Sequence, residues 1–114
     1  MGLRQDRLAD QIRDILGRSF QGGQMQDPRL QNIAVTAVKV TGDLQIASVY
    51  YRFFGEAEQP AVQAGLERAS GFLRNQLADG LDLRRVPNLR FFFDESVEEG
   101  ARIEQLLANL NQQN

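Results

Sequence analysis

Apolar residues near the start of the chain recur at the spacing of an amphipathic helix. They share one face of a helix from about residue 3 to residue 20, while arginines and aspartates fill the other positions. The apolar positions are Leu8, Ile12, Ile15, Leu16 and Phe20. Gly22 and Gly23 end the pattern, and the Pro at position 28 disfavours helical geometry in the residue before it. We therefore expect one helix followed by a non-helical linker.

The next pattern is that of two half-buried strands. Residues 33–40 are rich in β-branched side chains, and residues 44–54 carry apolar side chains at every second position. These positions are Ala47, Val49, Tyr51 and Phe53. Tyr50 then falls on the opposite, more open face. A Thr-Gly-Asp turn at 41–43 joins the two segments into a hairpin.

A second helical pattern spans residues 60–81 and begins at a Pro suited to the first turn of a helix. Its apolar positions are Val62, Leu66, Ala69, Leu73, Leu77 and Leu81. The tripeptide Ala69-Ser70-Gly71 lies inside it. Gly in a helix interior costs about 1 kcal/mol relative to Ala, and Ser competes there for backbone hydrogen bonds. The sequence leaves open one long helix and two helices joined by a kink or break at Ser70-Gly71.

Residues 88–94 form the third predicted strand. They include three successive Phe at 91–93, and this near-continuous apolar run favours a central position with both faces largely covered. We expect Phe91 and Phe93 in the core. Aromatic residues on an open sheet face can instead stack on bases, and Tyr50 is the stronger candidate for that role.

A last helix is predicted after the third strand. Ser96 with Glu99 fits a capping box, and apolar residues follow at helical spacing. They are Ile103, Leu106, Leu107 and Leu110. The polar end, about residues 109–114, is expected to fray. The order of elements predicts an α+β domain whose three-stranded sheet is covered by helices on one face.

The amino-acid composition excludes several classes of function. The chain has 114 residues, which suits a single domain over 1–114. It has no Cys and no His, which excludes thiolate and Ser-His-Asp catalysis and nearly all zinc sites. Its one Lys, Lys39, is followed by Val, so there is no Walker A loop. No apolar run approaches the ~20 residues of a membrane span, and the N-terminus has no signal core. We expect a cytoplasmic monomer that is not an enzyme and binds no cofactor or metal.

Charge is unevenly distributed along the chain. The net charge is −2, but residues 68–90 hold five Arg against two acids, a local balance of +3. Residues 94–104 hold five acids against one Arg, a local balance of −4. Local charge decides what a surface attracts within a Debye length of roughly 8 Å. The carboxylates at 94, 95, 98 and 99 are already explained by helix capping, so they do not require a metal or acid–base role.

Two segments are candidate anion sites. A break in the helix 60–81 would free the N–H groups of a second helix beside Arg68 and Arg74, which suits a sugar-phosphate backbone. An unbroken helix with a tolerated Gly is the equally weighted alternative. The tetrapeptide 27–30 (Asp-Pro-Arg-Leu) is a turn in which Arg29 could pair with a carboxylate, and a purely structural turn is the simpler interpretation.

Four ordered pieces of the sequence resemble the ribosome-binding factor A family. The first is the tetrapeptide 27–30 after an amphipathic helix, and the second is the strand with Val49-Tyr50 and Phe53. The third is 69–74 (Ala-Ser-Gly-Phe-Leu-Arg). The fourth and longest is 83–94 (Leu-Arg-Arg-Val-Pro-Asn-Leu-Arg-Phe-Phe-Phe-Asp), followed by Ser96, Glu99-Gly100 and Arg102-Ile103.

The resemblance covers about residues 3–110 and implies a single KH-like domain of the second type, α-β-β-α(kinked)-α-β plus a C-terminal helix. KH domains usually clamp nucleic acid with a Gly-x-x-Gly loop between two helices. No two Gly are three apart in this chain. The family has an Ala-x-Gly helix kink instead, and Ala69-Ser70-Gly71 matches it.

The resemblance also implies the function. It implies binding of the immature small (30S) ribosomal subunit and its 16S rRNA, late subunit maturation and processing of the rRNA 5′ end, especially in the cold, without catalysis. On this interpretation Ser70 and Gly71 let the RNA backbone approach closely. The cations expected to contact rRNA are Arg68, Arg74, Arg84, Arg85 and Arg29.

A second interpretation makes the same scaffold a protein-interaction module, because a fold does not fix a function. The acidic last helix would then bind basic ribosomal proteins or an assembly GTPase. Charge reversal separates the two interpretations. Reversal at Arg74, Arg84 and Arg85 should abolish subunit binding under the first, and reversal at Glu98, Glu99 and Glu104 under the second.

Overall fold

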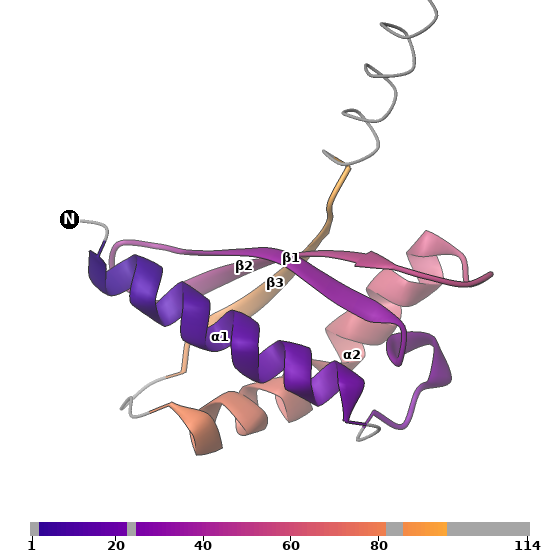
Figure 1. The fold of residues 1–114 in the computed structure, drawn as a ribbon, viewed down its shortest axis with the longest axis horizontal. Coiled ribbons are helices and arrows are strands. Elements are labelled where there is room, and N and C mark those ends of the chain that lie inside the picture. The colour runs from indigo at the N-terminus through magenta and orange to yellow at the C-terminus, as the bar shows by residue number, and fades with distance from the viewer. Residues whose placement is uncertain (1–2, 23–24, 82–85, 96–114) are drawn as a thin grey trace, which may run out of the picture.

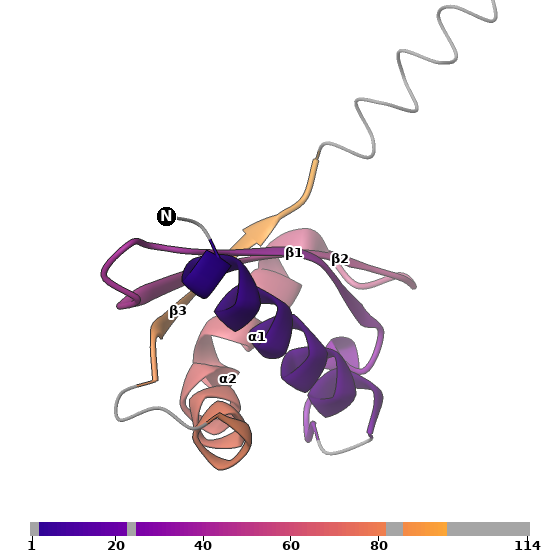
Figure 2. The same ribbon diagram turned by 60° about the vertical axis from the view of Figure 1, so that its left-hand side comes forward.

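A three-stranded sheet carries both long helices on one of its faces (Figures 1 and 2). The computed structural model describes residues 3–22, 25–81 and 86–95. Its elements are α1 (Leu3–Gln21), the short 3-10 helix η1 (Pro28–Leu30), β1 (Ile33–Val40), β2 (Ile46–Phe53), α2 (Gln59–Gly80) and β3 (Asn88–Phe93). The predicted α+β architecture is confirmed. The predicted last helix and its capping box lie outside the described residues.

β2 is the central strand, paired antiparallel with β1 and parallel with β3. Its inward side chains Ala47, Val49 and Tyr51 are buried, as the alternation predicted. The expected central position of β3 is wrong, because β3 lies at the edge of the sheet. Phe91 is buried and Phe92 is 43% exposed, so the apolar run serves two different faces.

The core lies between the sheet and the two helices. α1 packs against β1, and α2 packs against β3 and α1. Most of the buried side chains of the helices are periodic positions that the sequence indicated, although Ala69 is only partly buried. Burying each Leu or Ile contributes about 1.5–3 kcal/mol. They include Leu8, Ile12, Leu16 and Phe20 from α1, and Val62, Leu66, Leu73 and Leu77 from α2. No helix in the described part of the chain combines the length and apolar character needed to span a membrane.

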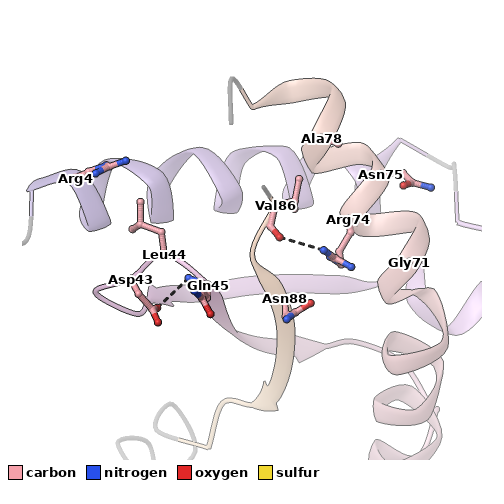
Figure 3. A pocket seen from close by; sticks show the side chains of 10 residues that line it. All are labelled: Arg4, Asp43, Leu44, Gln45, Gly71, Arg74, Asn75, Ala78, Val86 and Asn88. Atoms are coloured by element: carbon pink, nitrogen blue, oxygen red, sulfur yellow. Dashed lines mark hydrogen bonds between the residues drawn. The ribbon is translucent and has the colours of Figure 1, made fainter. Parts of the chain in front are cut away.

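α2 is one continuous helix of 22 residues. It runs through Ala69-Ser70-Gly71 without interruption, so a break into two separate helices is absent. Figures 1 and 3 show its axis changing direction near Gly71. Ser-Gly pairs are among the common causes of helix bending.

The β1–β2 turn depends on Leu44, which the sequence did not single out. Leu44 has φ 61°, in the left-handed region that a non-glycine residue rarely adopts. Its N–H donates to the Thr41 carbonyl, and the Thr41 N–H donates to the Ile46 carbonyl. The turn therefore directs the Leu44 side chain toward the core, where it packs partly buried.

Candidate nucleic-acid interface

An open hollow of about 910 Å³ lies beside the bend of α2 (Figure 3). Four parts of the chain meet there: the first turn of α1, the β1–β2 turn, the second half of α2 and the segment that begins β3. The lining residues are Arg4, Asp43, Leu44, Gln45, Gly71, Arg74, Asn75, Ala78, Val86 and Asn88. Two guanidiniums and three amides give the hollow hydrogen-bond donors suited to phosphate oxygens.

Arg74 is fixed at the wall of this hollow. Its Nη2 donates to the Val86 carbonyl at 3.2 Å, which joins α2 to the start of the β3 segment (Figure 3). One carbonyl uses only one of the five N–H donors of a guanidinium. The remaining donors of this exposed side chain are available to an anion.

The one described carboxylate in the hollow is already occupied by neighbouring donors. Asp43 Oδ1 accepts from the Thr41 hydroxyl at 2.7 Å and from the Gln45 N–H at 3.2 Å. These bonds hold the pKa of Asp43 below its usual value, with the Thr41 hydroxyl as the largest cause. Its charge partly offsets those of Arg4 and Arg74, so the described lining carries a net charge of +1 from two cations and one anion.

Gly71 leaves the outer surface of α2 bare between Arg68 and Arg74. A Cβ placed on Gly71 would meet nothing within 4 Å. Six residues of α-helix rise by about 9 Å, so Arg68 and Arg74 lie before and after this bare stretch along the chain, although their side chains leave α2 on different sides. A flat backbone surface of this kind allows a sugar-phosphate chain to come close.

Arg29 and Arg68 share a different carboxylate, that of Asp27. Arg29 Nε donates to Asp27 Oδ1 at 3.1 Å and its Nη2 donates to Oδ2 at 3.2 Å, while Arg68 Nη2 lies 4.0 Å from Oδ2. The Arg29 side chain is the largest cause that lowers the pKa of Asp27. The Arg29 fork is therefore engaged within the turn, as the carboxylate-pairing interpretation expected. Arg68 is more open, with 64% of its side chain exposed.

The structure distributes the predicted contacts over three sides of α2. Gly71 and Arg74 line the hollow of Figure 3, and Arg68 lines a smaller hollow next to Asp27. Ser70 lies on the β3 side, in a third hollow with Gln63 and Glu67. Arg84 and Arg85 lie outside the described residues.

One predicted feature of the site is not formed. A break near Ser70, one of the two equally weighted alternatives, would have freed the N–H groups of a second helix for an anion. Because α2 continues through this point, its N–H groups there are positioned to bond its own carbonyls four residues earlier. At this point of α2, side chains therefore supply the donors for an anion, and the bare surface at Gly71 gives it room to approach.

Sequence reasoning missed Arg4, Gln45, Asn75 and Asn88. Asn75 is four residues from Gly71, so helical spacing could have placed it on the same face. The other three come from α1, the β1–β2 turn and β3, and only the packing of the sheet against α1 and α2 brings them to one hollow. In the described residues, no group of acidic side chains could hold a metal ion.

A parallel strand pair joined through one long bent helix, with a cationic hollow beside the bend, defines a small KH-like domain without a Gly-x-x-Gly loop. The chain belongs to the ribosome-binding factor A family, whose model matches residues 4–107. The ribosome-binding factor A of Macrococcus caseolyticus is 38% identical over 97% of both chains.

A crystal structure and a model fitted into a cryo-electron microscopy map show the same fold. The crystal structure of ribosome-binding factor A from Thermus thermophilus has a TM-score of 0.68 at 32% identity and covers 77% of this chain and 93% of that one. A homology model of the Thermus factor, fitted into the cryo-electron microscopy map of its complex with the 30S subunit, has a TM-score of 0.63. It is 33% identical and covers 76% of this chain and 91% of that one.

Proposed function

We propose that this protein is a ribosome assembly factor that binds the immature 30S subunit through its 16S rRNA, acting as a monomer in the cytoplasm without catalysis or a cofactor. The family match over residues 4–107 carries the proposal. The Thermus relative fitted to the map of a 30S complex supports the choice of the small subunit.

The hollow of Figure 3 supports an RNA partner. Its donors come from α1, α2, the β1–β2 turn and the start of β3, and phosphate contacts of this kind fix the position of a protein on nucleic acid. In this proposal Arg74 and Arg4 neutralise phosphates while the backbone passes over Gly71. Arg68 extends the cationic surface toward Asp27. Arg84, Arg85, Ser70 and Arg29 remain proposed contacts from the sequence.

Co-sedimentation with precursor and mature small subunits tests the proposal. A variant with Arg74, Arg84 and Arg85 each changed to Glu should no longer pellet with precursor subunits, while wild-type protein pellets. The matched control changes Glu98, Glu99 and Glu104 to Lys and should keep binding. If the control variant loses binding and the arginine variant keeps it, the acidic segment binds a ribosomal protein or an assembly GTPase, and the RNA mechanism is wrong.

The proposal extends to late subunit maturation and processing of the 16S rRNA 5′ end, with the largest effect in the cold. This part is supported by family membership alone. A strain without the protein should accumulate rRNA with an unprocessed 5′ end, measured by primer extension, and more so at low temperature. Complementation with the wild-type chain should correct the defect and the triple arginine variant should not. Normal 5′ ends in the deletion strain at low temperature would exclude this role.

A further inference from the structure

The face of the sheet opposite the helices carries two stacked rings. Figure 2 shows both helices on the other side, and no described element covers this face. The Tyr50 and Phe92 ring centroids are 5.5 Å apart with planes inclined by 29°. Phe92 is 43% exposed, although Phe91, the residue before it in β3, is buried. Stacking uses one face of each ring, so the exposed Phe92 ring, on the outermost strand, keeps its other face for a ligand.

Strand register places these rings in an ordered row. Ala37, Tyr50 and Phe92 are direct neighbours across β1, β2 and β3. Ala37 is small, so it leaves the Tyr50 edge clear. The next row on the same face, two residues away along each strand, consists of Lys39, Ser48 and Arg90. Successive rows of side chains on one face of a sheet are about 7 Å apart along the strands. Across this sheet, β1 and β3 lie about 10 Å apart.

The second row supplies positive charge beside the rings. Lys39 Nζ lies 5.5 Å from the centre of the Tyr50 ring, and Arg90 is exposed on the same face as Phe92. Ser48 between them is too small to block access. Asp94, the carboxylate that directly follows β3, accepts a hydrogen bond from the Thr36 hydroxyl. The chain has a net charge of −2, so a cationic, aromatic face is a local reversal of its overall charge.

We propose that the Tyr50–Phe92 pair, bordered by Lys39 and Arg90, stacks with an unpaired base of single-stranded RNA whose phosphates contact the two cations. A second copy of the chain fits poorly, because a two-fold contact through this face would bring the four cations of the two copies close together. Base stacking on aromatic side chains needs only a π face, so this contact tolerates different sequences. RNA as the ligand rests on the proposed function, but the surface is separate from the hollow beside Gly71.

Fluorescence of a single-stranded oligoribonucleotide of about ten nucleotides, with 2-aminopurine at its centre, tests the stacking. Wild-type protein should quench the fluorophore. Tyr50→Leu with Phe92→Leu keeps apolar bulk but removes the rings, and it should weaken binding about 5- to 150-fold. Tyr50→Phe keeps the ring and should retain binding. Lys39→Gln with Arg90→Gln should weaken binding, whereas Arg13→Gln on the exposed side of α1 should not.

Two further measurements keep the test decisive. Amide NMR shifts of wild-type protein with the oligoribonucleotide should fall on β2 and β3 around Tyr50 and Phe92, which does not depend on any variant folding. Shifts confined to the hollow around Gly71, absence of quenching, or a concentration-dependent dimer lost in the leucine variant would each overturn the inference. Co-sedimentation with small ribosomal subunits separates the two proposals. Wild-type protein that fails to pellet with the subunits contradicts the proposed function, whereas the oligoribonucleotide measurements decide the stacking inference.

Discussion

At the scale of single residues, two glycines of α2 have opposite surroundings. A Cβ on Gly65 would lie 3.1 Å from Asp27 Oδ2 and 3.3 Å from Leu30 Cδ2, whereas Gly71 faces open space. Gly71→Ala should therefore stabilise the fold by about 0.5–1 kcal/mol through helix propensity. Gly65→Ala should destabilise it by about 1–3 kcal/mol, because Leu30 is buried and Asp27 is held by Arg29. Urea unfolding of the two variants measures both effects.

The same pair of variants separates stability from binding. If RNA passes over the bare surface at Gly71, then Gly71→Ala should bind small subunits more weakly than wild type while being more stable. A Gly71→Ala protein that is more stable and binds equally well would show that close approach at this point is not needed. Equal loss of stability in both variants would contradict the packing argument.

Asp27 gives a residue-scale prediction for pH. The hydrogen bond from the Arg29 side chain lowers the pKa of Asp27 below the ordinary value of 3.8. As the pH falls, the unfolded chain takes up the proton before the folded chain does, so stability from this carboxylate is present at neutral pH and is lost in acid. Asp27→Asn should be less stable than wild type near pH 7, and the difference should shrink below about pH 4.

Urea unfolding of both proteins across this pH range measures the difference. Asn can still accept the Arg29 N–H at the cap of η1, so the variant removes charge and keeps the local turn. Asp43, whose pKa the Thr41 hydroxyl also lowers, is present in both proteins, so its contribution cancels. A difference in stability that stays constant down to about pH 3 would contradict the assigned role of the ion pair.

At the scale of elements, one glutamine joins α2 to two strands. Gln63 Oε1 accepts from the buried Tyr51 hydroxyl of β2 at 2.6 Å, and its Nε2 donates to the Phe91 carbonyl of β3 at 2.8 Å. This carbonyl belongs to an edge strand, which has no further strand beside it among the described residues. The side chain of α2 therefore replaces a missing strand neighbour.

Gln63→Leu should destabilise the fold by about 1–3 kcal/mol, because it removes the acceptor of the Tyr51 hydroxyl and the side-chain donor to the Phe91 carbonyl. The Gln59 Nε2 donor, 3.4 Å from the Tyr51 hydroxyl oxygen, remains. Tyr51→Phe alone should cost about 1 kcal/mol. Added to Gln63→Leu, it should cost less than it does alone, since the hydroxyl has already lost its acceptor. A double-mutant cycle from urea unfolding measures this coupling, and strictly additive costs would show that the two side chains act independently.

The elements also show where sequence reasoning stops. Helical spacing predicted α1 to within a residue or two of its bounds, and alternation predicted the buried face of β2, because both depend on near neighbours in the chain. The edge position of β3 depends on which strand lies beside it, which no local pattern records. The residues of the candidate site divide in the same way, into those that local spacing can predict and those that it cannot. Gly71 and Arg74 could be paired by helical spacing, whereas Arg4 joins them only through tertiary packing.

At the scale of the whole molecule, a net charge of −2 must coexist with binding to a polyanion. The described cations that we assign to phosphate lie in the hollows beside α2 and on the open face of the sheet. The acidic residues of 94–104 come later in the sequence, after β3. With roughly 3–5 phosphate contacts, log K for subunit binding should fall with log salt at a slope of about −2 to −4. Arg74→Gln should reduce that slope by about one, because one phosphate contact is lost. Co-sedimentation across a salt series measures both slopes, with Arg13→Gln as the matched control. Subunit binding that does not respond to salt would mean that the protein binds the subunit through protein contacts. The cationic hollow beside Gly71 would then not be the rRNA contact.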